Sequence, residues 1–278
     1  MSTLLIDAGS TKMDWVLLEN GIVTQRLATK GFNPNYAEKQ QFMEILSEVD
    51  LPKTDVEKVF YYGSGCLKAE NAQTVGMMLQ QHFPNSVPMV SNDMMGAAHA
   101  LLGQGKGIAC ILGTGANSCL YDGNTITDRA VSLGYLVGDE GSGCYIGRKL
   151  VRAYFYDLMP LQLKLEFEDI YQLTISNFID KVYHQPEASK YLAGFTKFAG
   201  DHQEDPFIQQ LVKSCFLDFI EVFVLRYKDC HSLPIGFVGS VAYHFQGLLK
   251  ECLEAEGLTI GQVIQSPMEG LIRYHSVD

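Results

Sequence analysis

Apolar and polar positions alternate in short blocks along the first hundred residues, in a pattern that predicts both strands and helices. Apolar runs at residues 3–6 and 15–18 flank a turn of small residues, and a third strand is expected over residues 21–29. One-sided apolar spacing predicts helices at 37–49 and 69–83, a helix through residue 102, and strands at 56–62 and 87–90. The first part of the chain is therefore expected to form three linked strands and then alternating helices and strands.

The same order begins again at residue 107. A strand at 108–112 leads into a turn of small residues at 113–117, and a hairpin strand at 118–121 and a third strand follow it. Further on, strands are expected at 235–238 and 258–264, and helices at 244–255 and 267–274. A pattern that recurs in this way indicates an internal duplication, with two α/β halves of order βββαβαβα facing each other across a cleft.

The segments that lie between these matching parts are mostly helical. A glycine-rich stretch at 138–143 precedes an expected helix at 145–156, for which Ser142 is a plausible N-cap. Residues 158–202 form a helix-rich insertion in which no chemical motif is found, and 206–227 are predicted to be one long core helix. The predicted domains are residues 1–106 and residues 107–265, the second carrying the insertion near 158–202.

Composition narrows the class of protein. The 278 residues, 47% of them hydrophobic and 19% charged, suffice for two modest domains, and no apolar run approaches the length of a membrane span. A net charge of −11 argues against nucleic acid or an anionic membrane as a partner, and a cytoplasmic protein is expected. The seven cysteines are odd in number and lack Cys-x-x-Cys spacing, and the seven histidines are spread singly. Buried, reduced thiols are favoured over disulfides or a zinc site.

The turn after the first strand has groups suited to a phosphate and its metal. Gly9 lets backbone amides approach a ligand, and Thr11 offers a hydroxyl. Asp7 is a candidate for a water-mediated contact to Mg²⁺, and Asp139 is a second candidate. Taken alone, such a turn after a strand is more often a simple hairpin than a phosphate loop. Two such turns, one from each half, pointing at one nucleotide are a much more specific signal, and neither a Walker-type P-loop nor a Gly-x-Ser-x-Gly elbow occurs.

Asp93 is the best candidate for the residue that takes a proton from an acceptor hydroxyl. It follows an apolar strand and begins a helix, and the ligand crevice of an open α/β sheet lies at such strand ends. Phosphoryl transfer needs an oriented acceptor and little covalent chemistry, so one carboxylate would suffice. An equally good interpretation from position alone is that Asp93 only caps its helix.

Five stretches together resemble the ordered motifs of the N-acetylglucosamine kinase family, within the BadF/BadG/BcrA/BcrD ATPase group. They span nearly the whole chain and comprise Asp7-Ala8-Gly9-Ser10-Thr11-Lys12, Ser91-Asn92-Asp93, Leu112-Gly113-Thr114-Gly115-Ala116-Asn117, Gly134-Tyr135-Leu136-Val137-Gly138-Asp139-Glu140-Gly141-Ser142-Gly143 and Val238-Gly239-Ser240-Val241. The resemblance implies the two-lobed actin-like ATPase (ribonuclease H-like) fold of sugar kinases, with the last helix, 266–278, returning to the first domain. It also suggests a homodimer.

The resemblance further implies roles for individual residues, with ATP and Mg²⁺ as cofactors and Asp93 as the catalytic base. Thr11 and Thr114 would contact the phosphates, and the turn at Gly239 and Ser240 would border the adenosine. The remaining residues of the two phosphate turns would also lie at the nucleotide: Gly9, Ser10, Lys12, Gly113 and Gly115. The sugar would be held by polar groups of both halves: Asn33, Asn117, Asp139 and Gly143.

These residues predict an ATP-dependent kinase that phosphorylates a hydroxyl of an amino sugar, N-acetylglucosamine or glucosamine. A second hypothesis is an ATPase that activates a dehydratase or reductase and holds an iron-sulfur cluster at a dimer interface, for which Cys119 and Cys144 are the thiols near the phosphate motifs. A third is a catalytically silent sugar sensor. The presence of Asp7, Asp93 and both turns argues against the sensor.

Overall fold

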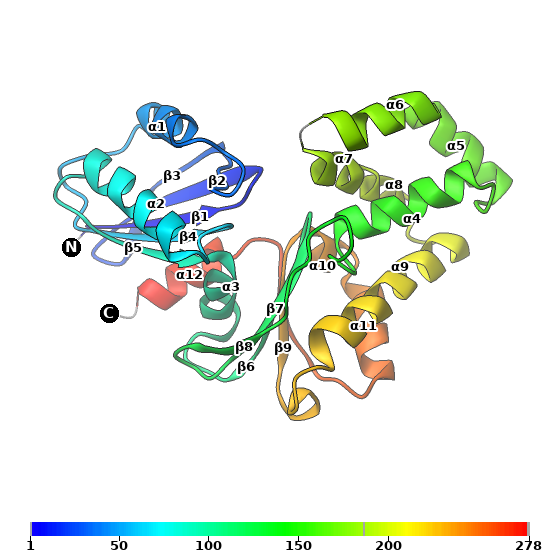
Figure 1. Ribbon diagram of the computed structural model, residues 1–278. Coiled ribbons are helices and arrows are strands. Elements are labelled where there is room, and N and C mark those ends of the chain that lie inside the picture. Colours follow the sequence, from blue (N-terminus) through cyan, green and yellow to red (C-terminus); the bar gives the residue numbers. More distant parts are fainter. Residues whose placement is uncertain (1, 186, 277–278) are drawn as a thin grey trace. The chain divides into compact units, whose positions relative to one another are not determined.

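The computed structural model describes residues 2–185 and 187–276, and these fall into two compact units. Unit 1 comprises residues up to Gln104 together with the segment that begins at Ser266, and unit 2 comprises Gly105–Gln265 (Figure 1). The boundary between the two units thus lies two residues before the one drawn from the sequence. Positions 277 and 278 of the predicted last helix lie outside the described residues.

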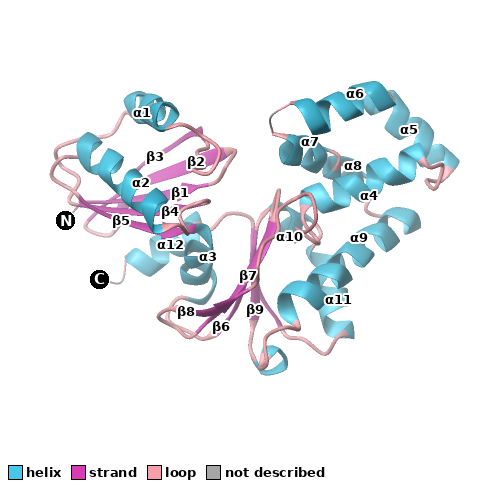
Figure 2. Cartoon of the chain, viewed as in Figure 1, coloured by secondary structure: helices cyan, strands magenta, loops and turns pink. Residues whose placement is uncertain are grey.

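Unit 1 is built on a five-stranded sheet of order β3-β2-β1-β4-β5 (Figure 2). β1 pairs antiparallel with β2 and parallel with β4, and β4 pairs parallel with β5. The carboxyl ends of β1, β4 and β5 therefore lie side by side at one edge of the sheet. The strands are β1 (Ser2–Ala8), β2 (Lys12–Glu19), β3 (Ile22–Lys30), β4 (Lys58–Gly63) and β5 (Val87–Asn92).

Helices cover both faces of the unit 1 sheet. Alternate residues of β1, such as Leu4 and Ile6, enter a core with Phe42 of α1 and Val75 of α2. The opposite face carries α3, against which the last helix α12 packs, so the end of the chain returns to unit 1. The helices are α1 (Lys39–Glu48), α2 (Ala69–His82), α3 (Asp93–Leu102) and α12 (Met268–His275).

Unit 2 repeats the same sheet topology with the order β10-β9-β6-β7-β8. β6 pairs antiparallel with β7 and parallel with β9, as β1 does with β2 and β4 in unit 1. The strands are β6 (Gly107–Leu112), β7 (Ala116–Tyr121), β8 (Ile126–Arg129), β9 (Ile235–Val238) and β10 (Ile260–Ile264). The predicted duplication and the actin-like fold class are confirmed by these two matching sheets.

Most helices of the chain belong to unit 2, where they share one apolar core with the sheet. α4 packs closely on α7, because Gly147 lacks a side chain at the point where a Cβ would lie 1.9 Å from the Leu192 carbonyl oxygen. The helical elements are α4 (Gly143–Phe155), α5 (Leu161–Tyr171), α6 (Ile175–Ile179), η1 (Asp180–His184), α7 (Ala188–Gly194), α8 (Thr196–Asp201), α9 (Pro206–Phe219), η2 (Ile220–Val224), η3 (Cys230–Ser232), α10 (Ser240–His244) and α11 (Gln246–Ala255).

Two predicted helices of unit 2 differ from those observed. The long helix expected over 206–227 is α-helical only to Phe219 and continues as a π-turn, in which the Leu225 amide donates to the Ile220 carbonyl at 2.9 Å. The helix expected at 244–255 is α11, which begins at Gln246, and the short helix α10 that ends at His244 was not expected. Phe245 separates the two, with a buried ring and a backbone outside helical geometry. Apolar spacing could not separate these cases, because one π-turn or one irregular residue barely shifts a 3.6-residue pattern.

The sequence predicts that no segment is long and apolar enough to span a membrane, and the helices of the structure can be compared with this prediction. Among residues 2–185 and 187–276, none of the helices combines the length and the apolar character that crossing a bilayer requires.

Candidate active site

The turn between β1 and β2 is hydrogen-bonded to the segment that follows β3. The Gly9 amide donates to the Lys12 carbonyl at 3.0 Å, which closes the turn. The Gly31 amide then donates to the Thr11 carbonyl at 3.0 Å, and the Phe32 amide donates to the Gly9 carbonyl at 3.2 Å. A Cβ at Gly31 would lie 2.4 Å from the Thr11 nitrogen, so this contact requires glycine. Ser10, Thr11 and Lys12 are left exposed at the tip of the turn.

The candidate sugar residue Asn33 lies beside this turn in unit 1. Its amide nitrogen donates to the Ser10 hydroxyl at 3.1 Å, and its amide oxygen accepts from the Asn35 backbone at 3.0 Å. Gly65 closes the other side, because a Cβ there would lie 2.3 Å from the Asn33 oxygen. The structure thus brings Asn33 and the first phosphate turn together within one unit.

Asp93 stands at the carboxyl end of β5, beside the ends of β4 and β1. One of its carboxylate oxygens accepts from the Ser64 hydroxyl at 2.8 Å, and the other accepts from the Met94 amide at 2.9 Å. The N-cap of α3 is Asn92, whose side chain accepts from the Met95 amide at 3.0 Å. Asp93 is therefore not the N-cap of α3, although its carboxylate does accept an amide of the first helical turn.

The carboxylates at this edge of unit 1 repel one another. Burial raises the pKa of Asp7 to about 7, and the charges of Asp14 and Asp93 raise it further than the Lys12 charge lowers it. Lys12 is itself paired with Asp14 at 2.6 Å. Burial also raises the pKa of Asp93, against the opposing effect of its hydrogen bonds from Ser64 and Met94. Lys12 offsets only part of this repulsion, so a second cation near Asp7 and Asp93 would stabilise their charged forms.

The residues present fit a cation that keeps most of its waters. In the described part of the chain, no three acidic, histidine or cysteine side chains form a cluster that could enclose a metal directly. Asp7 and Asp93 interact as charges but do not form such a cage. This arrangement suits Mg²⁺, which is commonly held by one or two carboxylates together with substrate phosphates and water.

The matching turn of unit 2, between β6 and β7, is held by a helix instead of a loop. The Gly113 amide donates to the Gly115 carbonyl at 3.0 Å, which closes the turn. At the start of α4 the Gly143 amide donates to the Gly113 carbonyl at 2.8 Å, and the Cys144 amide donates to the Thr114 carbonyl at 3.1 Å. Gly143, predicted to be a sugar residue, is thus part of the support of the second phosphate turn.

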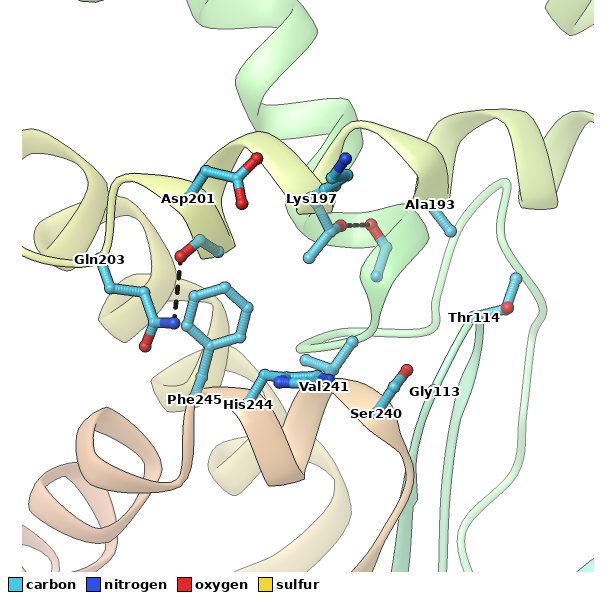
Figure 3. Close-up of a pocket in the computed structure, with 13 residues that line it drawn as sticks. Gly113, Thr114, Ala193, Lys197, Asp201, Gln203, Ser240, Val241, His244 and Phe245 are labelled. Carbon is cyan, nitrogen blue, oxygen red and sulfur yellow. Dashed lines mark hydrogen bonds between the residues drawn. The ribbon is translucent and has the colours of Figure 1, made fainter. Parts of the chain in front are cut away.

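A pocket of about 410 Å³ opens on this turn, and all of its lining residues belong to unit 2 (Figure 3). Gly113 and Thr114 form one wall, and Ser240 at the start of α10 lies beside them. Gly239 permits this approach, because its φ is +129° and a Cβ there would lie 2.2 Å from the Leu112 carbonyl oxygen. The other lining residues come from the start of α4, from α10 and the residue that follows it, and from the segment from α7 to Gln203: Gly143, Ala193, Thr196, Lys197, Gly200, Asp201, Gln203, Val241, His244 and Phe245.

Asp139 lies next to the second turn but is not among the residues that line this pocket. Its side chain is 8% exposed, and its carboxylate is 3.4 Å from the Ala116 amide and 3.5 Å from the Ser132 hydroxyl. Burial raises the pKa of Asp139. Asn117 is nearby on β7, where its side-chain oxygen accepts from the Ser118 amide at 2.9 Å. Within unit 2 the turn, Asn117 and Asp139 are therefore neighbours.

The similarity to solved structures decides the family. No family model and no curated protein sequence matches this chain. The structure of a "putative N-acetylglucosamine kinase" from Porphyromonas gingivalis is 40% identical in sequence, with a TM-score of 0.95 over 99% of each chain. This chain belongs to the N-acetylglucosamine kinase family.

More distant structures share the fold of this family member. A protein of the same description from Chromobacterium violaceum is 17% identical, with a TM-score of 0.73 over 98% of each chain. The ethanolamine utilization protein EutJ from Carboxydothermus hydrogenoformans is 16% identical, with a TM-score of 0.58 over 100% of this chain and 90% of its own. The actin-like scaffold thus occurs in proteins of different description, and function must be argued from the site.

One wall of the pocket was not predicted from the sequence of this kinase family member. Lys197, Asp201 and Gln203 lie in or just after α8, in the insertion where no motif was found, and Figure 3 shows them opposite Ser240 and His244. Thr196 links this wall to the phosphate turn, because its hydroxyl donates to the Gly143 carbonyl at 2.6 Å. No signal in the local sequence marks these residues, because the opposite wall at Ser240 and His244 lies about forty positions further along the chain.

Proposed function

We propose that this protein is an ATP-dependent sugar kinase that transfers the γ-phosphoryl group to a hydroxyl of an amino sugar, N-acetylglucosamine or glucosamine. The observation that carries the proposal is the pocket of unit 2, in which the Gly113–Thr114 turn and Ser240 meet. These residues come from two motifs more than 120 positions apart, in a chain 40% identical to a protein described as such a kinase.

The pocket has the size and the chemistry that a nucleotide needs. A cavity of about 410 Å³ lies within the range of small-molecule sites. The Phe245 and Val241 side chains offer apolar surface for a base, and the polar ends of Lys197, Asp201 and Gln203 offer hydrogen bonds. The exposed Thr114 turn at the other end of the pocket supplies a hydroxyl and a glycine backbone that phosphates can approach closely.

Asp93 is suited to accept the proton of the sugar hydroxyl. The hydrogen bonds from Ser64 and Met94 fix the orientation of both carboxylate oxygens, and each oxygen keeps a further lone pair. The raised pKa of Asp93 makes the carboxylate a stronger base than an ordinary aspartate. Holding the acceptor hydroxyl against this carboxylate is the main task of the protein in phosphoryl transfer.

Asp7 would hold Mg²⁺ through water, and the bound ion would neutralise charge on the phosphates. The ion would also relieve the repulsion among Asp7, Asp14 and Asp93, which burial makes costly. Asp7 thereby links metal binding to the protonation state of the site.

The cysteines favour the kinase over the activator ATPase. Cys119 and Cys144 are both fully buried, and the other five cysteines are buried as well. Burial raises the pKa of the Cys144 thiol to about 11. An iron-sulfur cluster shared between two subunits needs thiolates at a surface, whereas these thiols are buried and the Cys144 thiol does not ionise readily.

The test is an ADP-release assay with ATP and Mg²⁺ against N-acetylglucosamine, glucosamine, N-acetylmannosamine, N-acetylmuramic acid and glucose. The proposal expects turnover that depends on one amino sugar and stops when Mg²⁺ is chelated. ATP hydrolysis that ignores every sugar would instead support the activator, and iron would then be measured. ATP binding without any turnover would support the silent sensor.

A further inference from the structure

The Arg148 guanidinium donates hydrogen bonds to backbone carbonyls of a single loop. Arg148 lies in the second turn of α4, and its guanidinium reaches back to the segment that precedes the helix. Nη1 donates to the Tyr135 carbonyl at 2.5 Å and to the Leu136 carbonyl at 2.8 Å, and Nη2 donates to the Gly138 carbonyl at 3.0 Å. The group also lies over the Tyr145 ring, 5.0 Å from its centroid. Three carbonyls of one turn are thus bound by one planar cation.

The loop that Arg148 holds has little apolar burial of its own. Leu133, Leu136 and Val137 are 65%, 66% and 70% exposed. The Gly138 amide donates to the Gly134 carbonyl at 2.9 Å, which closes the turn internally. A segment with so few buried contacts is expected to open locally unless hydrogen bonds fix it, and Arg148 supplies three of them.

The residue that follows this loop is Asp139, and its orientation depends on the backbone. Its φ is +58°, which is an uncommon conformation for a residue with a side chain. The hydrogen bonds to its carboxylate are long, at 3.4 Å from the Ala116 amide and 3.5 Å from the Ser132 hydroxyl. A buried carboxylate held this weakly keeps acceptor positions for a ligand, but it does not hold itself in place.

We propose that Arg148 is a positioning residue for the sugar: it fixes the loop at 134–138 so that the Asp139 carboxylate meets the sugar hydroxyls. The inference rests on the proposed function, and on the role of sugar ligand that the family resemblance implies for Asp139. Lysine would not replace Arg148, because an ammonium is a point charge and cannot bind three carbonyls with a planar fork.

The experiment compares Arg148→Met and Arg148→Lys with Arg152→Met. Arg152 lies one turn further along α4, is exposed and contacts the Tyr156 ring at 5.6 Å, so its loss removes the same charge from the same helix. We expect Arg148→Met to raise the KM for the sugar by about 10-fold or more, with kcat and the KM for ATP within about 3-fold of wild type. Arg148→Lys should recover less than half of this loss on a logarithmic scale, and Arg152→Met should match the wild type.

Hydrogen exchange without any ligand provides a second measurement. In Arg148→Met the amides of 134–139 should exchange about 10-fold faster or more, while those of α4 beyond its first turn keep their protection. This measurement detects whether the helix remains folded, and it can be made on the lysine variant if the methionine variant does not fold.

The proposal is overturned by an unchanged sugar KM, by an equal effect of Arg152→Met, by full recovery in Arg148→Lys, or by unchanged exchange in the loop. These outcomes differ from failure of the proposed function, in which wild-type protein would turn over no sugar at all. In that case exchange of the loop still decides whether Arg148 fixes the backbone at Asp139.

Discussion

The two turns that open the duplicated halves share a topology and differ in what surrounds them. The Gly9 turn of unit 1 is supported by a loop, through the Gly31 and Phe32 amides, and it lies among acidic side chains. The Gly113 turn of unit 2 is supported by the start of α4 and opens on an apolar and polar pocket. The same strand pairing therefore places the turn among acidic side chains in unit 1 and beside a pocket in unit 2.

This difference shows how a duplicated fold can divide the work of one reaction. In unit 1 the strand ends hold Asp7, Ser64 and Asp93, which suit proton transfer and a metal. In unit 2 the glycines permit close backbone approach, and the helical insertion supplies one wall of the pocket. Changes in unit 1 should therefore affect chemistry and pH dependence, and changes in unit 2 should affect binding and packing.

The largest expected effect is from Asp93→Asn in unit 1. The amide cannot accept the sugar proton, so kcat should fall by about 10³-fold while the affinity for ATP stays within twofold. Turnover and calorimetric titration of ATP would be measured on the same preparation. Asp14→Asn is the control, because the Asp14 carboxylate is paired with Lys12. This substitution should lower kcat by less than about tenfold. A parallel loss of ATP binding would contradict the division between the units.

Gly239→Ala in unit 2 should act on packing. Its Cβ would lie 2.2 Å from the Leu112 carbonyl oxygen at a φ of +129°, so the free energy of unfolding should fall by about 3 kcal/mol. Gly113→Ala is the matched control from the same region of unit 2, because no atom lies within 4 Å of a Cβ there. It should unfold within about 1 kcal/mol of wild type. Urea denaturation compares the two, and equal stabilities would contradict the structure.

Asp7→Asn should stabilise unit 1 while weakening activity. The unfolded Asp7 loses its proton near pH 3.8 and the folded one near pH 7, so wild-type stability falls as pH rises through this interval and stays low above it. Without Mg²⁺ at pH 8, the variant should gain about 1 to 3 kcal/mol, less than the full pKa difference because Asp7 is partly exposed. Denaturation at pH 4 and pH 8 tests this, and a variant that is no more stable at pH 8 would exclude it.

The smallest effect concerns two histidines, one in each unit. Burial lowers the pKa of His99 to about 4, whereas the carboxylate of Glu166 raises the pKa of His202 despite partial burial. The stability that His99 contributes is present above pH 6.5 and is lost as pH falls toward 4. The stability that His202 contributes is present below pH 6.5 and is lost as the pH rises through the pKa of His202 in the folded protein.

Asp7 and His99 oppose each other in the same unit, so the pH dependence of His99 should emerge in Asp7→Asn. Acidification of that variant from pH 7 to 5 should cost about 1 kcal/mol, and the further change His99→Gln should remove the cost. In unit 2, His202→Gln should change stability by less than about 1 kcal/mol, because the Glu166 partner is exposed. Thermal unfolding at both pH values measures these differences. A cost that persists in the double variant would assign it to another group.

The sequence by itself determined the strands, most helices and the two turns, because each depends on local periodicity and on glycine at defined positions. It also singled out Asp93, since a polar residue directly after a buried strand lies at the ligand edge of an α/β sheet. The family followed from motifs in the right order and is confirmed by the similarity to a solved structure.

Only the tertiary structure decided that Asn92 caps α3, which leaves both Asp93 oxygens oriented by Ser64 and Met94. It also brought the α8 segment, from a stretch without any motif, onto the pocket. Residues that meet across 40 to 130 positions leave no local pattern, because their contact depends on how helices and strands pack and not on spacing along the chain. The local sequence therefore specified the turns, and packing specified what each turn faces.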